Sequence, residues 1–320
     1  MARRTPWTNS RVPDLAGRLV VITGGDRGLG FEAAKVLAAA GADLVIASHE
    51  PERGAAATEA ISRIEPRAQV RCEPIDLADL ASVEAFAAGR RLDGRPIDVL
   101  INNAGIMFVP ERMESVDGFE LQLATNFLGH YALTGHLLDL VRAAPAPRVI
   151  WASSVATRWG RIRLHDLHRA RRYHPAFAYC QSKLACLMAA VELDRRSRDG
   201  DWGVSSIAAH PGFARTDLQR TGPRLGRGDG FTWSGAAGHL PRFSHTASEG
   251  AQGLIRAAAD PDVEGGTYLG PTRSFGAIGS PERVPILRKA RDRRTIDALW
   301  AQAAIATGVT WPGARDRTAA

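Results

Sequence analysis

The stretch that decides the fold is T-G-G-D-R-G-L-G, Thr23–Gly30, which follows a short β-branched run at Leu19–Ile22. Three of its glycines are Gly24, Gly28 and Gly30. Glycine permits positive φ and lets the backbone approach a pyrophosphate, while a following helix offers free N–H groups and the positive end of its dipole. An alanine-rich helical pattern, Phe31–Ala40, comes next. This order of strand, turn and helix predicts a phosphate cradle at the start of a βαβ unit.

Strand and helix patterns continue to alternate along the chain. Further strands are predicted at Leu44–Ala47, Val70–Ile75, Ile97–Ile101, Arg148–Ala152 and Val204–Ala208. Helices are predicted at Leu80–Ala88, around a face formed by Phe119, Leu123, Phe127 and Tyr131, and at Tyr179–Leu193. The alternation predicts an α/β fold, a Rossmann-type doubly wound parallel sheet with helices on both faces and ligands at the carboxyl ends of its strands. Because no repeat or low-complexity linker divides residues 1–320, we expect a single dinucleotide-binding catalytic domain with its core at about 15–270.

Composition excludes several other classes of protein. With 45% hydrophobic residues, the chain can bury a sizeable core. The three cysteines have no metal-ligand spacing and are too few for a disulfide framework, so no metal is predicted and a cytoplasmic location is expected. No apolar stretch suits a signal peptide or a membrane span. The net charge of +7 is scattered, which favours a solvated surface, or attraction to an anionic ligand, over nucleic-acid binding. A homo-oligomer is left open.

A second motif begins the last of these helices, Tyr179-Cys180-Gln181-Ser182-Lys183. The spacing i, i+4 places the phenol and the ammonium group on one helical face. A free tyrosine, with a pKa near 10, is a poor general base at neutral pH, but an adjacent cation lowers that pKa. The chain has only 4 tyrosines, and its only lysines are Lys35, Lys183 and Lys289. The pair therefore predicts a proton shuttle to or from a hydroxyl or carbonyl oxygen.

Together with further motifs in the same order, these residues resemble the short-chain dehydrogenase/reductase family over about residues 15–270. The shared motifs include T-G-x-x-x-G-x-G, Asn102-Asn103-Ala104-Gly105, a strand ending in Ser153-Ser154, Y-x-x-x-K, and Pro211-Gly212-x-x-x-Thr216. The resemblance implies a catalytic set of Asn126, Ser154, Tyr179 and Lys183. In this set Ser154 orients the reacting oxygen, Lys183 holds the nicotinamide ribose, and the backbone of Asn126 holds a proton-relay water.

The resemblance also implies a nicotinamide cofactor, NADP(H) in preference to NAD(H). Ser48 stands where NAD-type members carry Asp, and Arg27 stands where NADP-type members often carry a base, although it could be a solvated turn residue. His49 replaces an arginine that many relatives carry, and Arg53 could compensate. The implied cofactor-binding residues are Gly24, Asp26, Arg27, Gly28, Leu29, Gly30, Ser48, His49, Asp76, Leu77, Asn103, Ala104, Gly105, Tyr179, Lys183, Pro211, Gly212 and Thr216.

Three of these positions carry finer expectations. Asp76 is expected to hydrogen-bond the adenine, and Thr216 is expected near the carboxamide or the phosphates. The segment Asn102–Gly105 either steadies the central sheet or contacts the cofactor, and the sequence leaves both readings open.

The spacing of the implied catalytic residues points to one branch of this family. Ser154 and Tyr179 lie 25 residues apart, about twice the gap of many members. This gap resembles the branch of retinol dehydrogenases, WW-domain oxidoreductases and protochlorophyllide reductases, which often handle bulky apolar substrates. The implied function is hydride transfer between the nicotinamide cofactor and an alcohol or carbonyl substrate, expected to be apolar.

Two segments near the expected site and one at the end of the chain break the regular pattern. Thr157–Ala178 has few apolar residues, and Arg220–His245 is predicted to be a substrate lid or, alternatively, a permanent surface loop. A C-terminal extension at about 272–320 contains a predicted helix around Thr295–Ala304.

Two rival functions share the fold. A cofactor-binding regulator that has lost turnover commonly loses one catalytic residue, whereas the set here is intact. An epimerase or dehydratase of the extended fold usually carries T-G-x-x-G-x-x-G, which this chain lacks.

Overall fold

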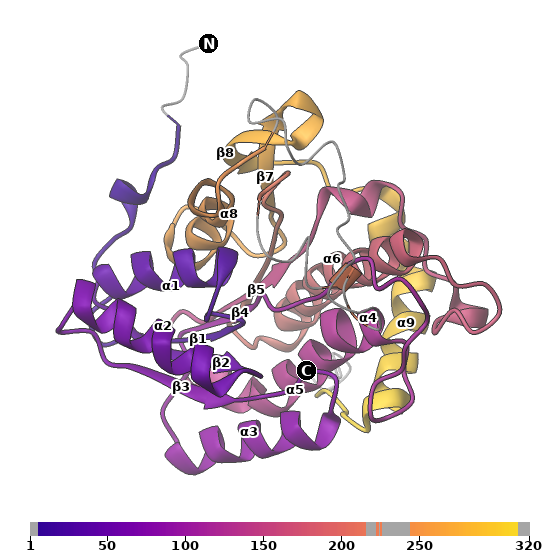
Figure 1. Ribbon diagram of the computed structural model, residues 1–320, viewed down its shortest axis with the longest axis horizontal. Helices are drawn as coiled ribbons and strands as arrows, with labels where there is room; N and C mark the ends of the chain where they lie inside the picture. The colour runs from indigo at the N-terminus through magenta and orange to yellow at the C-terminus, as the bar shows by residue number, and fades with distance from the viewer. Residues whose placement is uncertain (1–5, 216–221, 224, 226–243, 313–320) are drawn as a thin grey trace, which may run out of the picture.

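An eight-stranded sheet forms the centre of the computed structural model, which describes residues 6–215, 222–223, 225 and 244–312 (Figure 1). Its strands are β1 (Leu19–Thr23), β2 (Asp43–Ser48), β3 (Val70–Pro74), β4 (Val99–Asn102), β5 (Arg148–Ala152), β6 (Ser205–Ala209), β7 (Tyr268–Arg273) and β8 (Ile278–Arg283). Their order is β3-β2-β1-β4-β5-β6-β7-β8, and every pair is parallel except β7 with β8. The strand order reverses between β1 and β4, the place where such sheets bind ligands. The predicted fold class is confirmed.

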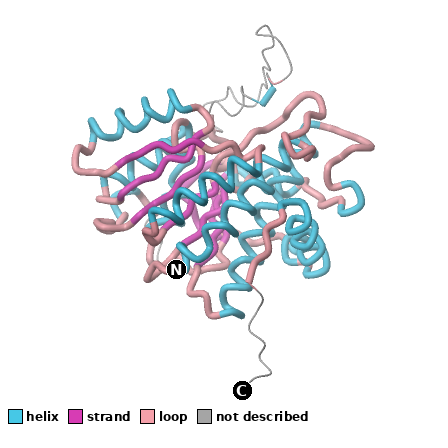
Figure 2. Tube along the Cα trace, turned by 90° about the horizontal axis from the view of Figure 1, so that it is seen from below, coloured by secondary structure: helices cyan, strands magenta, loops and turns pink. Residues whose placement is uncertain are grey.

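Helices cover both faces of this sheet (Figure 2). They are α1 (Gly28–Ala39), α2 (Pro51–Ile64), α3 (Leu80–Asp93), α4 (Leu121–Leu123), α5 (Gly129–Arg142), α6 (Pro175–Gly200), α8 (Ala247–Ala259) and α9 (Arg293–Thr307). Successive residues of β1 alternate between two core layers, as the period of a strand requires. Val20 and Ile22 belong to the layer with α1, α2 and α8, whereas Leu19 and Val21 belong to the layer with α3, α5, α6 and α9. None of the helices described is long and apolar enough to cross a membrane.

One predicted helix differs in its start and its geometry. Phe119 precedes the helix rather than lying on its face, and its ring stacks on His168 at 5.2 Å. The helix starts after Glu120, whose buried carboxylate accepts the N–H groups of Gln122 and Leu123 at 3.0 and 2.7 Å. A π-helical turn, η2 (Ala124–Leu128), then separates α4 from α5. The side-chain cap, which local periodicity does not reveal, sets this boundary.

The sheet also runs beyond the predicted strands. Helices α2 and α8 and the pair β7–β8 have no counterpart in the sequence prediction. Gly270 and Pro271 interrupt the apolar pattern of β7. Gly270 is nevertheless required there, because an added Cβ would lie 1.9 Å from Nε2 of the buried His210. Close packing between strands therefore selects a residue that reads locally as a turn.

The predicted C-terminal helix is confirmed as α9, which packs on α5 and α6. Trp300 of α9 and Trp311 after it enclose Tyr131 of α5, with ring centroids 4.9 to 5.3 Å apart in all three pairs. This aromatic cluster fastens the end of the chain to the body of the sheet domain.

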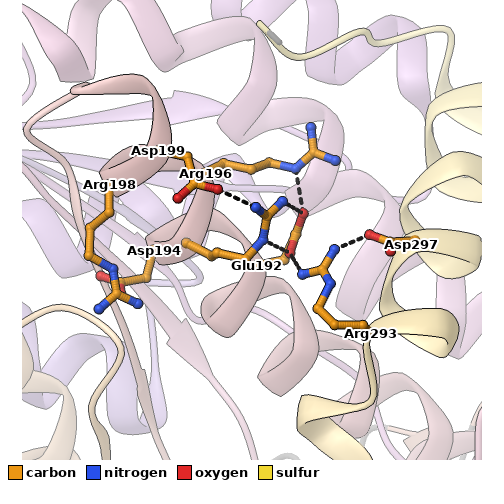
Figure 3. Close-up of polar contacts among 8 residues, drawn as sticks. Glu192, Asp194, Arg196, Arg198, Asp199, Arg293 and Asp297 are labelled. Carbon is orange, nitrogen blue, oxygen red and sulfur yellow. Dashed lines mark hydrogen bonds and ion pairs between the residues drawn. The ribbon is translucent and has the colours of Figure 1, made fainter. Parts of the chain in front are cut away.

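A buried carboxylate of α6 also joins this helix to α9 (Figure 3). Glu192 of α6 is fully buried, and its oxygens accept hydrogen bonds from Arg195 at 2.8 Å and Arg196 at 2.7 Å. Arg293, at the start of α9, pairs with Glu192 and also with Asp297. The C-terminal extension is thereby joined to the helix that carries Tyr179 and the other active-site residues of α6.

Candidate active site

A cavity of about 340 Å³ opens at the carboxyl ends of the strands, where the strand order reverses. It brings together most of the residues predicted to bind cofactor. Those that line it are Gly24, Asp26, Arg27, Gly28, Leu29, Ser48, His49, Asp76, Leu77, Asn103, Ala104, Gly105 and Lys183. Apolar side chains of Ile106, Leu121 and Leu225 share the same cavity.

The glycine-rich turn fits a pyrophosphate. Gly24 and Gly28 have φ of +63° and +55°, and α1 begins at Gly28 without a side-chain cap from Arg27. The first N–H groups of α1 are therefore available to an anion. Gly30 does not line the cavity; an added Cβ there would lie 2.1 Å from the carbonyl oxygen of Gly24. Its role is to let α1 pack closely against the turn.

Asn103 holds this turn in place. Its side-chain amide donates to the carbonyl oxygens of Thr23 at 2.9 Å and Gly24 at 3.2 Å. The neighbouring Asn102 donates to the hydroxyl of Thr134 at 2.9 Å. Both asparagines therefore stabilise the protein by internal hydrogen bonds, and Asn103 also lines the cavity.

At the end of β2 the predicted basic residues surround an acid. Arg27 lies 3.0 Å from a carboxylate oxygen of Glu50, Arg53 lies 2.8 Å from the other, and His49 lies 3.5 Å away. Ser48 is buried, and its hydroxyl accepts the N–H of Glu50 at 3.1 Å. Arg27 is thus neither free in solvent nor unpaired. The acid absent from position 48 is supplied two residues later, between two guanidinium groups.

Asp76 and Leu77 form the cavity wall beyond β3. A carboxylate oxygen of Asp76 accepts the N–H of Ala78 at 2.8 Å, which fixes the side chain while leaving the residue exposed. Leu77 is held against α5, because an added Cβ on Gly129 would lie 2.3 Å from its carbonyl oxygen.

Ser154, Tyr179 and Lys183 meet beside the end of β5. Ser154 follows β5, and its side chain lies close enough to the phenol of Tyr179 to act on the pKa of that group. The hydroxyl of Ser154 also accepts the N–H of Ala156 at 3.1 Å, where it caps η3 (Val155–Arg158). Lys183 lies one helical turn after Tyr179 and donates to the carbonyl oxygen of Ala152 at 3.0 Å. The hydroxyl of the neighbouring Ser153 instead donates to the carbonyl oxygen of Lys183 at 3.1 Å, within the protein core.

The pKa of Tyr179 differs from the expectation. Burial raises this pKa to about 12, although the hydrogen bond with Ser154 acts in the opposite direction. Burial also lowers the pKa of Lys183, whose ammonium group points to a backbone carbonyl. The predicted depression of the phenol pKa by Lys183 is not found, because burial is the largest influence on this pKa and Lys183 is not among the groups that lower it. At neutral pH Tyr179 is a protonated phenol.

Asn126 lies in the π-helical turn, a feature that often marks functional sites. Its side chain accepts the N–H of Ile106 at 2.8 Å and donates to the hydroxyl of Ser182 at 2.9 Å. Its backbone carbonyl, expected to hold a relay water, accepts from Cys186 Sγ at 3.1 Å and lies 3.0 Å from His130 Nδ1. Two side chains therefore already contact the oxygen at which the relay water is expected.

His130 connects this turn to the glycine-rich loop, a link that the sequence prediction missed. Because a carbonyl only accepts, Nδ1 carries the proton toward Asn126, and Nε2 accepts from the Thr23 hydroxyl at 2.8 Å. The same hydroxyl accepts the N–H groups of Asn103 and Ala104 at 2.9 and 3.0 Å. Burial lowers the pKa of His130 to about 3, so the ring stays neutral.

Tyr179, Pro211 and Gly212 were also predicted to bind cofactor but do not line the cavity, although Lys183 of the same helix as Tyr179 does. Gly212 packs against the connection between β7 and β8, since an added Cβ there would lie 2.2 Å from the carbonyl oxygen of Ala277, and Pro211 lies beside Gly250 of α8. Thr216 and most of the predicted lid at 220–245 lie outside the described residues. In the parts of the chain that are described, no group of three His, Cys, Asp or Glu side chains could hold a metal ion.

Comparisons with known proteins agree with this geometry. Residues 18–224 match the family model described as "short chain dehydrogenase". Human "Retinol dehydrogenase 12" is 35% identical over 306 residues, covering 95% of this chain and 90% of that protein. Mouse "Polyprenol dehydrogenase" is also 35% identical, over 303 residues, covering 93% of this chain and 86% of that protein.

Solved structures show the same likeness. The structure of an uncharacterized protein from Mycobacterium Paratuberculosis has 37% sequence identity and a TM-score of 0.79, covering 96% of this chain and all of that one (100%). The Pseudomonas aeruginosa "RhlG/NADP active-site complex" has 28% identity and a TM-score of 0.52, covering 65% and 77%. The chain belongs to the short-chain dehydrogenase/reductase family, in its retinol-dehydrogenase-like branch, and is a nicotinamide-dependent oxidoreductase that acts on CH–OH groups.

Proposed function

We propose that this enzyme uses NADP(H) to interconvert an apolar alcohol and its carbonyl compound, with Tyr179 as the proton donor and acceptor. The proposal is carried by the position of Lys183, which lines the cofactor cavity one helical turn after Tyr179, together with Ser154 beside the Tyr179 phenol. A positioned phenol and a second hydroxyl suit a reacting oxygen that gains or loses a proton.

The bound nicotinamide supplies or takes up the hydride on carbon. The side chains of this chain manage the oxygen. In carbonyl reduction, the Tyr179 phenol donates its proton to the oxygen as charge develops there, while Ser154 holds the oxygen by a hydrogen bond. A pKa of about 12 keeps the phenol in the donating form. Lys183 lines the cavity beside Gly105 and is placed to hold the ribose and to compensate charge on the phenolate.

The surroundings of Glu50 support the choice of NADP(H). Arg27 and Arg53 both contact this carboxylate at one end of the cavity. A 2′-phosphate is a stronger acceptor than a ribose hydroxyl and would compete with Glu50 for the two guanidinium groups. The RhlG complex named above contains NADP. NAD(H) is the alternative, with Glu50 accepting the ribose 2′-hydroxyl.

An apolar substrate is supported by the cavity and by the relatives. Ile106, Leu121 and Leu225 bring apolar side chains to the cavity. Two of the relatives are named after retinol and polyprenol, which are predominantly apolar alcohols.

Two matched variants test the cofactor choice. Arg27→Ala should weaken NADPH binding by about 10- to 150-fold, the loss of a hydrogen bond between charged groups worth about 1.5–3 kcal/mol, and should leave NADH binding nearly unchanged. Glu50→Gln removes the competing charge, so NADPH binding should stay equal or become tighter. Binding is measured by titration of cofactor fluorescence.

The same pair can overturn the proposal. If Glu50 accepts the ribose hydroxyl of NAD(H), Glu50→Gln will weaken NADH binding and Arg27→Ala will not discriminate between the cofactors. A wild type that prefers NADH would also refute the choice. A screen of apolar aldehydes, ketones and alcohols at the nicotinamide absorbance then tests the reaction itself.

A further inference from the structure

Phe108 has a strained backbone next to the catalytic tyrosine. Its φ is +59°, in the left-handed region that a residue with a Cβ rarely adopts. Few other non-glycine residues in the described ranges share this feature, and they are Arg169, Asp201, Ser274 and Phe275. Phe108 lies three residues after Gly105, in the segment whose Ile106 lines the cofactor cavity. Strain that persists at such a place is an observation that points to function.

Buried polar side chains hold this segment on both sides. Gln122, fully buried in α4, accepts the N–H of Phe108 at 2.7 Å. Gln122 also donates to the hydroxyl of Tyr173 at 3.0 Å, and that hydroxyl donates to the carbonyl oxygen of Val109 at 2.7 Å. Tyr173 comes from the long insert between Ser154 and Tyr179, so this insert supports the strained segment.

Asn126, in the π-helical turn, also holds this segment by side-chain hydrogen bonds. It accepts the N–H of Ile106 at 2.8 Å and donates to the carbonyl oxygen of the same residue at 2.9 Å. Residues 106, 108 and 109 are therefore each fixed by a separate hydrogen bond from a side chain. Such a frame over-determines the backbone and keeps it in a conformation that phenylalanine would otherwise leave.

These side-chain hydrogen bonds fix the position of the Phe108 ring. The Phe108 ring packs edge to face on the Tyr179 ring, with centroids 5.4 Å apart and an interplanar angle of 72°. Because the Phe108 ring touches the Tyr179 ring and Ser154 lies beside the same phenol, we expect the groups attached to the reacting carbon of a substrate held there to lie near Phe108. The ring offers dispersion contacts but no hydrogen-bond partner to the groups attached to the carbonyl carbon.

We propose that Phe108 is a specificity-determining residue that selects substrates with apolar groups beside the reacting carbon and rejects hydroxylated ones. This inference rests on the proposed function of the site. A hydroxyl placed against the ring loses its water without gaining a partner, which lowers kcat/KM relative to a methyl group of the same size by about 10- to 100-fold.

Two aldehydes of similar shape test the inference. In 2-methylbutanal, methyl groups stand where glyceraldehyde has its two hydroxyls. Wild type should favour 2-methylbutanal by about tenfold or more in kcat/KM. Phe108→Asn and Phe108→Gly remove the ring, and both new residues tolerate the left-handed backbone. In both variants the ratio should fall at least about fivefold, with cofactor affinity unchanged.

Phe275 provides a matched control. It is also a phenylalanine with positive φ, 57°, but its ring is 91% exposed. Phe275→Asn should leave the ratio as in wild type. Phe108 variants that turn over both aldehydes with the wild-type ratio would overturn the inference and leave the proposed function intact. A wild type that reduces neither these nor other aldehydes with either cofactor would overturn the proposed function, and the inference with it.

Discussion

Replacing Glu192 by Gln should destabilise the enzyme through the attachment of its C-terminal helix. The Glu192 carboxylate is fully buried and accepts hydrogen bonds from Arg195 and Arg196. Figure 3 shows it with Arg196 and with Arg293, its partner on α9. Burial by itself raises its pKa, but the hydrogen bonds from the three arginines outweigh burial and lower the pKa to about 2. Gln keeps the size of the side chain and removes the charge.

The shift in pKa gives the size of the effect. A pKa of 4.5 in the unfolded chain and about 2 in the folded protein corresponds to about 3 kcal/mol of stability, at about 1.4 kcal/mol per pH unit. Because the folded-state pKa is the lower one, this contribution is complete above about pH 5 and disappears as the pH falls toward 2. The arginines are partly exposed and can be solvated once Glu192 is replaced, so the loss should not much exceed this value.

Thermal unfolding measures the loss. For 320 residues the entropy of unfolding is about 0.7 kcal/mol/K, so Glu192→Gln should lower Tm by about 4 °C at pH 7. Glu264→Gln is the control, since Glu264 forms an exposed pair with Arg283 at 3.5 Å and should change Tm by less than about 1 °C. The reasoning fails if both variants match wild type at pH 7, or if the Tm difference for Glu192→Gln does not narrow between pH 5 and pH 3.

Two further substitutions test the catalytic residues and their support. Tyr179→Phe should reduce kcat/KM by about 10²- to 10⁴-fold without changing the Kd of the cofactor, because only the proton donor is lost; activity within a few-fold of wild type would refute the assignment. Lys289 donates to the carbonyl oxygens of Arg158 and Gly160, both at 2.7 Å, and so supports the segment that begins at Ser154. Lys289→Met should therefore reduce kcat by about tenfold with unchanged cofactor affinity, whereas Lys35→Met should not, and equal kcat for the two variants would contradict this role.

The sequence predicted the features that depend only on residues close together in the chain. The turn around Gly24 and Gly28, the strands of the sheet centre and the i, i+4 pair of Tyr179 and Lys183 all lie where the pattern places them. Each depends on residues within a few positions of one another, on backbone freedom at glycine or on the period of a helix or strand. The motif also includes Gly30, but glycine is needed there for close packing against Gly24 and not for contact with the cavity.

Only the tertiary structure decided how these groups are tuned. The pKa of Tyr179 rises because the fold buries the phenol, an effect that the i, i+4 spacing to Lys183 does not reveal. The carbonyl of Asn126 receives a hydrogen bond from Cys186, 60 residues away. The positive φ of Phe108 is held by Gln122 and by Tyr173 of the long insert. Burial, long-range hydrogen bonds and strain depend on which residues the fold brings together, so no window of neighbouring sequence contains them.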